Sequence, residues 1–253
     1  MEFFWKQQDD IPDGMGYPLF GTEHIVSTAV TLGLAVAFLV VFRKMNEKRQ
    51  RLVLKIVPLF MVGLEIFKDL FLVHVHRFSL GYLPLHVCSV GIFVFLLREF
   101  LPWQKAKAVF GEIAFILRLP ATLAARIFPD WTVYYPELNF INLHSFLWHG
   151  LLVLYPLMVF FKGEVSPSVK HIHYVLLFLL AVVPPVYAFD KHFGYNYFFV
   201  NWPLSGTPLE WIASGMGNPG YLVGYAGLAI AVMLLVYLLV HLLTKAFSGH
   251  GRA

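Results

Sequence analysis

Residues 24–42 read HIVSTAVTLGLAVAFLVVF, a run without Asp, Glu, Lys or Arg. At about 1.5 Å per residue, a helix of this length is just long enough to cross the hydrocarbon core of a bilayer, which is about 30 Å thick. Comparable apolar runs recur along the 253-residue chain, in which 58% of residues are hydrophobic and only 13% are charged. Soluble domains average about 25% charged residues. The sequence therefore predicts an all-α integral membrane protein with several spans.

Seven spans are expected, in a seven-transmembrane helix bundle that forms a single transmembrane domain over residues 1–253. The predicted spans are residues 24–42, 53–74, 83–100, 107–128, 138–161, 172–190 and 220–244, and a long loop covers 191–219.

The loop charges predict how the chain is oriented in the membrane. Basic residues concentrate in alternate loops, above all in the first, residues 43–51, while the other set of loops is poor in them. Cytoplasmic loops carry the excess of Lys and Arg, so we expect the N-terminus outside, the C-terminus inside and the 191–219 loop on the outer side. The net charge of +4 is thus a signature of topology and not of nucleic-acid binding.

The second predicted span carries three charged residues in an apolar setting. Glu65, Lys68 and Asp69 are spaced i, i+3 and i+4, so they share one face of a helix. They can form a self-neutralising cluster, or Glu65 can supply a residual charge to a neighbouring group. Ionisable residues within spans are costly and mark functional sites by default.

The third predicted span opens with LPLHVC, residues 83–88, and contains the only cysteine of the chain. Cys88 is expected about one turn inside this helix, on the outer side. A lone cysteine in an apolar helix is most often a small packing residue. The adjacent His86 and the histidines of another span favour a nucleophile, because an imidazole can take the thiol proton.

His144 and His149 lie five residues apart in the fifth predicted span. They point roughly 140° apart on a helix, so they cannot both face one cysteine. His144 matches the depth of Cys88 better, at ~9 Å against ~7 Å from the helix start. Both remain candidates for the base.

Metal ligation and cofactor binding are not indicated. The pairs His74/His76 and His171/His173 are spaced i, i+2 and point apart on a helix. The chain has no HExxH, no CxxC, and no glycine-rich nucleotide-binding loop. We expect no metal and no cofactor.

Several short motifs follow one another in a familiar order. They are Phe20 to His24, Glu65, LPLHVC at 83–88, Pro129-Asp130, Tyr135-Pro136, His149-Gly150, residues 194–197 and Pro219-Gly220-Tyr221. The chain resembles the YwaF / transmembrane protein 164 family over nearly its whole length. Lys68 and Arg118, inside predicted spans, depart from the family's pattern.

The resemblance implies a seven-helix fold related to intramembrane lipid enzymes. Eukaryotic members are described as phospholipid acyltransferases that use a cysteine and a histidine. Carried over, Cys88 would be the nucleophile, and the following Gly150 makes His149 the first choice of base, with His144 as the alternative.

We therefore expect an intramembrane enzyme that transfers acyl chains between membrane phospholipids through a thioester on Cys88. Glu65 would orient the histidine, as in a triad, and Asn196 or loop amides would stabilise the oxyanion. A lipid hydrolase would use the same residues. A proton-coupled transporter or small-solute binding protein is the rival class, with Cys88 as packing.

A bacterial protein of this kind would lie in the plasma membrane. The residues expected to surround the substrate are His86, Lys68, Asp69, Asn196, Tyr197 and His24.

Overall fold

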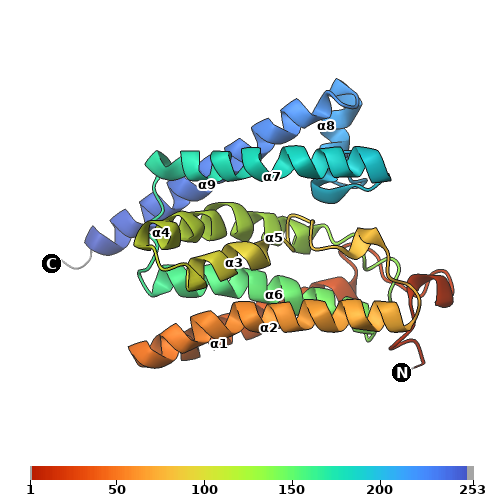
Figure 1. Ribbon diagram of the computed structural model, residues 1–253, viewed down its shortest axis with the longest axis horizontal. Coiled ribbons are helices and arrows are strands. Elements are labelled where there is room, and N and C mark those ends of the chain that lie inside the picture. Colours follow the sequence, from red (N-terminus) through yellow and green to blue (C-terminus); the bar gives the residue numbers. More distant parts are fainter. Residues whose placement is uncertain (1, 250–253) are drawn as a thin grey trace.

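The chain folds as a bundle of roughly aligned helices (Figure 1). The computed structural model describes residues 2–249, with side chains to residue 245; it is 72% helical and has no β-strand in this part. The long and medium helices are α1 (Thr22–Lys44), α2 (Glu47–His74), α3 (Gly91–Phe100), α4 (Gln104–Ile113), the π-helix η3 (Ala114–Arg118), α5 (Leu119–Ile127), α6 (Phe140–Phe161), α7 (Ile172–Phe193), α8 (Pro208–Met216) and α9 (Tyr221–Gly249). Four 3-10 turns are η1 (Gln8–Asp10), η2 (Leu80–Tyr82), η4 (Val169–His171) and η5 (Tyr197–Phe199).

Five helical stretches of the described chain are long and apolar enough to cross a membrane. They are Thr22–Lys44, Gln104–Ile127, Phe140–Phe161, Val169–Phe193 and Tyr221–Lys245. The 28-residue α2 has the length but carries more charge, and α3 has only 10 residues. The ends of the chain lie at opposite ends of the bundle (Figure 1).

The third predicted span is the main departure from the sequence-based expectation. Residues 83–100 were predicted as one helix, but the helix begins only at Gly91. Pro84 accounts for the extended Leu83, because the helical conformation is disfavoured for the residue before a proline. Leu83 accordingly has φ −59° and ψ 148°. Pro84 does not account for the turns over residues 84–90, since proline is tolerated in the first turn of a helix. The chain then proceeds through short turns, in which Gly91 N donates to Cys88 O at 3.1 Å.

Helix α6 forms the centre of the bundle. It packs against α1, α2, α5 and η3, and most of its residues are buried. Glycine permits its closest approach to α1, because a Cβ on Gly150 would lie 2.6 Å from Cγ2 of Thr31. Gly91 plays the same part at the start of α3, where a Cβ would lie 2.8 Å from Leu152 Cδ2. Both glycines therefore bring α6 close to its neighbours.

Helices α7, α8 and α9 form a second layer on one side of this body (Figure 1). α7 contacts α4, and α9 contacts η3 and α5. The predicted loop 191–219 is not free coil, since it contains η5 and α8. Asn196 organises this loop: its Oδ1 accepts from the backbone N–H groups of Asn201 and Trp202, both at 3.0 Å.

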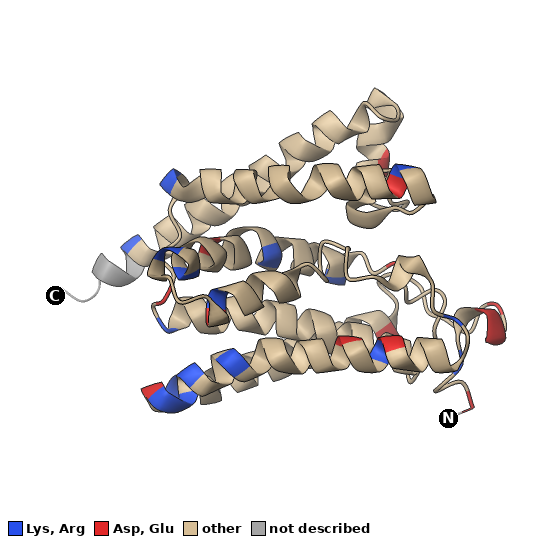
Figure 2. Cartoon of the chain, in the orientation of Figure 1, with Lys and Arg blue, Asp and Glu red and all other residues tan. Residues whose placement is uncertain are grey.

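Charged residues divide between the two ends of the bundle (Figure 2). Lys and Arg gather at the end where α1 gives way to α2, and Asp and Glu are prominent at the other end. At that second end the N-terminal segment folds back over the helices. Asn139 holds it in place by donating from Nδ2 to the carbonyl oxygens of Phe3 and Lys6, both at 2.8 Å.

Candidate active site

Cys88 lies in the turns that precede α3, and not one turn inside a helix as predicted. Its side chain is half-buried and packs against the main hydrophobic core. Residues 81–89 are all partly exposed. Irregular backbone at membrane depth is tolerated only where it is buried in protein or lines a wet cavity. Two charged side chains, Arg118 and Asp130, act electrostatically on the Cys88 sulfur.

Arg118 is the unusual neighbour of the cysteine. It is 1% exposed, and its Nε, Nη1 and Nη2 atoms have no hydrogen-bond partner among the described residues. The guanidinium lies 5.4 Å from the ring centroid of Phe178, and the side chain passes the start of α3 at Gly91. Arg118 ends the π-helix η3, a kind of irregularity that is frequent at functional sites. An arginine within an apolar stretch was the sequence signal for it.

His149 has the tautomer that a general base needs. Its Nδ1 lies 2.7 Å from the carbonyl oxygen of Ser145. A carbonyl only accepts hydrogen bonds, so in the neutral ring Nδ1 carries the proton and Nε2 carries the lone pair. The ring is stacked on Trp131 at a centroid distance of 4.9 Å. Arg126 and His86 act on it electrostatically, whereas the charged groups that act on the Cys88 sulfur are Arg118 and Asp130.

His144 faces another part of the bundle. It is buried, stacked on Trp148, and its Nε2 has no partner in the described part of the chain. Its neighbours on α2 are Lys68 and the backbone of Leu64. The two histidines thus diverge, as their spacing predicted. The Cys88 thiol makes no hydrogen bond to His86, His144 or His149 in the described structure.

The charged residues on the face of α2 pair with one another, and their formal charges leave one carboxylate in excess. Lys68 Nζ donates to Glu65 Oε1 at 2.7 Å and lies 3.2 Å from Asp69 Oδ1. It also donates to the carbonyl oxygen of Tyr82 at 3.3 Å, which ties α2 to η2. Glu65 is therefore engaged by Lys68, and no hydrogen bond joins it to a histidine among the described residues. The predicted triad role of Glu65 finds no contact here.

The remaining predicted substrate residues separate into two groups. His24 joins two helices, since its Nδ1 accepts from Phe20 N at 3.0 Å and its Nε2 donates to Arg126 O at 2.8 Å. Asn196 is occupied within its own loop, which leaves its amide no part in an oxyanion hole. Tyr197 packs edge-on against His86 at 4.6 Å and donates from its hydroxyl to Leu80 O, so it contacts the segment that leads to Cys88.

Arg126 is a second buried arginine that sequence analysis did not single out. It is 2% exposed and lies in the last turn of α5, over the ring of Phe146 at 4.2 Å. Nη2 donates to the carbonyl oxygen of Ser27 at 3.3 Å, while Nε and Nη1 have no partner in the described chain. The guanidinium is thus incompletely satisfied, next to His149.

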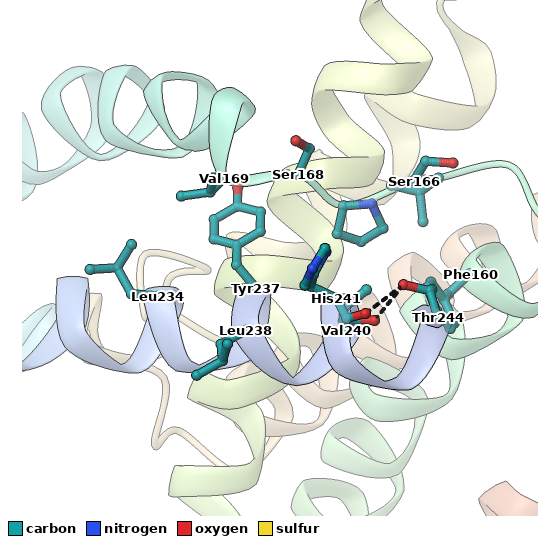
Figure 3. Close-up of a pocket in the computed structure, with 12 residues that line it drawn as sticks. Phe160, Ser166, Ser168, Val169, Leu234, Tyr237, Leu238, Val240, His241 and Thr244 are labelled. Carbon is teal, nitrogen blue, oxygen red and sulfur yellow. Dashed lines mark hydrogen bonds between the residues drawn. The ribbon is translucent and has the colours of Figure 1, made fainter. Parts of the chain in front are cut away.

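Two cavities are evident, and neither is lined by Cys88, His144 or His149. One of about 600 Å³ lies between residues 160–169 and the second half of α9, where Tyr237 and His241 line it (Figure 3). A smaller one of about 50 Å³ lies between residues 128–130 and 204–207. The cysteine lies outside both of these cavities, and its side chain is partly exposed. Among the described residues no group of three or more His, Cys, Asp or Glu side chains could hold a metal ion.

The fold and the site define a multi-pass membrane protein with a half-buried cysteine, buried histidines and two incompletely paired arginines at its centre. The sequence profile of the TMEM164 family matches residues 19–237, and the chain belongs to that family. The resemblance drawn from the sequence is thereby confirmed. No curated protein and no solved structure matches the chain.

Proposed function

We propose that this protein is an intramembrane lipid acyltransferase that carries the acyl group as a thioester on Cys88. The observation that carries the proposal is the guanidinium of Arg118, which has no hydrogen-bond partner among the described residues and acts electrostatically on the Cys88 sulfur, on which the carboxylate of Asp130 acts in the opposite sense. A thiolate is the reactive form of cysteine, and a neighbouring arginine favours it. In a site of low dielectric such an electrostatic partner is worth far more than in water.

The first half-reaction forms the acyl-enzyme. The lone pair of His149 Nε2 takes the thiol proton, and the sulfur attacks the ester carbonyl carbon of a phospholipid. The carbon–oxygen bond to the glycerol breaks, and the leaving alkoxide takes the proton from the imidazolium. A lysophospholipid leaves, and the acyl chain stays on Cys88.

The second half-reaction runs in reverse with a new partner. The acceptor hydroxyl gives its proton to His149 and attacks the thioester carbon. The carbon–sulfur bond then breaks and regenerates the cysteine. With water as acceptor the same steps would release a free fatty acid, which makes the enzyme a hydrolase.

Arg118 has a second use in this scheme. Each half-reaction passes through a tetrahedral intermediate with a negatively charged oxygen, and a preorganised cation stabilises that charge. Its unengaged N–H groups fit this role better than Asn196, whose amide is satisfied within its loop.

A seven-pass membrane topology would bring the Cys88 site near one surface of the membrane. We propose seven passes, with α2 and the 83–100 segment added to the five apolar stretches. The basic end of the bundle (Figure 2) fits the cytoplasmic side, which gives an external N-terminus and an internal C-terminus. The irregular residues 83–90 would then face the outer leaflet, in the plasma membrane if the source is bacterial.

An acyl-exchange assay tests the function. Purified protein is mixed with a phospholipid that carries a labelled acyl chain and with an unlabelled lysophospholipid. We expect labelled product from the wild type and none from Cys88→Ala. Labelled free fatty acid alone would identify a hydrolase. Absence of both, with substrate-dependent proton flux into liposomes that survives Cys88→Ala, would favour a transporter.

A further inference from the structure

We propose that Arg126 binds the phosphodiester group of the lipid substrate. That the bound lipid is a substrate rests on the proposed function. That Arg126 binds an anion is inferred separately, from the lack of an ion pair for its buried guanidinium. It predicts that the enzyme acts on phospholipids and discriminates against neutral lipids that carry the same acyl chains.

Another arginine of this chain, Arg98, shows how a buried arginine with a structural role is neutralised. Arg98 is 1% exposed, and its guanidinium is paired with the carboxylates of Glu99 and Glu164. Arg126 is equally buried but forms no ion pair in the described part of the chain, and two of its three nitrogens are unpartnered. An uncompensated buried charge costs several kcal/mol as an order of magnitude. The missing anion is therefore expected from a ligand.

Among the described residues, no carboxylate pairs with the Arg126 guanidinium to supply that anion. The acidic group that acts electrostatically on Arg126 is the phenol of Tyr17. Burial raises the pKa of Tyr17 above its ordinary value, so the phenol is neutral at physiological pH. Its hydroxyl donates to Asn142 Oδ1 at 3.1 Å. The other close partners of the Arg126 guanidinium are the Phe146 ring and the Ser27 carbonyl, and both are uncharged.

The position of Arg126 suits a lipid phosphate. It lies in the last turn of α5, at the end of the bundle where α1 and α6 begin, and its backbone carbonyl is bound by His24 at the start of α1. Arg118 lies eight residues earlier, hence ~12 Å deeper along the helix axis. A phosphate at Arg126 would thus lie near the headgroup level, while the ester groups reach inward toward Arg118 and Cys88.

The chemistry also matches. A phosphodiester carries one negative charge and several acceptor oxygens, and guanidinium–phosphate hydrogen bonds are among the strong, charge-assisted kind. The site would be formed next to His149, so binding of the headgroup would place the ester close to the base.

Lipid binding to the full-length Cys88→Ala protein in detergent tests the proposal without turnover. Dioleoyl phosphatidylglycerol, its neutral counterpart dioleoylglycerol and inorganic phosphate are titrated separately, with intrinsic tryptophan fluorescence and native mass spectrometry as readouts. Adding Arg126→Gln should weaken phosphatidylglycerol binding at least about tenfold and leave dioleoylglycerol binding unchanged. Arg126→Lys, which keeps the charge, should lie between. Arg77→Gln, which removes an exposed arginine paired with Asp9 and Asp10, is the matched control and should bind like the parent.

Unchanged phosphatidylglycerol binding in Arg126→Gln would overturn the proposal, as would an equal loss for both lipids in a protein that unfolds at the same temperature as its parent. Phosphate binding that needs Arg126 while lipid binding does not would replace the lipid by a soluble phosphate. Failure of the proposed function is read from the wild type instead: no labelled product would form in the acyl-exchange assay, while the effect of Arg126→Gln on phosphatidylglycerol binding would remain.

Discussion

The buried guanidinium of Arg98 donates to the carboxylate of Glu164 at 2.6 Å, which connects α3 to the turn after α6. Burial alone would raise the pKa of Glu164, but hydrogen bonds from Arg98 and Lys162 outweigh it, and the pKa lies below its ordinary value. A carboxyl group whose pKa is lowered on folding stabilises the protein above its unfolded-state pKa, about 4.3. That stability is lost as the pH falls through the folded-state pKa.

Glu164→Gln should therefore destabilise the protein near pH 7, because it leaves the Arg98 charge without one of its two carboxylates. The difference in unfolding temperature between wild type and variant should shrink as the pH falls below about 4.3. Thermal unfolding in detergent from pH 7 to pH 3.5 measures it. A difference that stays constant over this range would show that the ion pair is not its source.

Two of the three arginines that are buried in the described part of the chain, Arg98 and Arg118, should respond in opposite ways to loss of charge. Arg98→Met leaves Glu99 and Glu164 unpaired and should cost roughly 3–5 kcal/mol. Arg118→Met removes a charge that has no partner, so stability should be unchanged or higher, while acyl transfer should fall by about 10²–10³. Chemical denaturation and the acyl-exchange assay, applied to both variants, provide the comparison. If Arg118→Met lowered the free energy of unfolding as much as Arg98→Met does, the expected difference between the two arginines would be contradicted.

The histidines should differ as bases. His149→Gln should lower transfer by about 10²–10⁴, the usual contribution of a general base. His144→Gln serves as the matched control on the same helix and should retain most activity, since His144 faces Lys68 on α2. Rates measured at saturating lipid decide between them, and the reverse order would assign the base to His144.

Gly150 should prove to be a packing residue. Gly150→Ala adds a methyl group that would lie 2.6 Å from Thr31 Cγ2, which should destabilise the protein by about 1–3 kcal/mol. Thr31→Ser lacks Cγ2 but keeps the hydroxyl that donates to Ser27 O at 2.7 Å. The double variant should recover much of the loss in a double-mutant cycle. No recovery would mean that Gly150 is needed for another reason.

The sequence was sufficient for the helical class and for the long apolar helices, because hydrocarbon-length runs such as residues 24–42 allow few other structures. It misplaced the start of α3, since hydropathy reports how apolar residues 83–90 are and not whether they form turns or a helix. The divergence of His144 and His149 followed from their spacing alone.

The sequence could not predict which side chains pair with one another in the folded protein. Lys68 was expected to pair with a carboxylate, and it does, but that pairing also takes Glu65 away from the histidines. His24 looked like a site residue, yet both of its ring nitrogens are engaged: Nδ1 by the N–H of Phe20 just before α1, and Nε2 by the carbonyl oxygen of Arg126 on α5. The lack of a partner for Arg118 depends on which helices surround it, and no local pattern encodes that.

The most direct measurement is the intact mass of purified wild type and Cys88→Ser after incubation with phospholipid. Formation of a thioester predicts an added acyl mass on the wild type that neutral hydroxylamine removes, and a more stable ester on Cys88→Ser. Lipid conversion without an adduct on either protein, or an adduct retained in Cys88→Ala, would contradict Cys88 as the nucleophile.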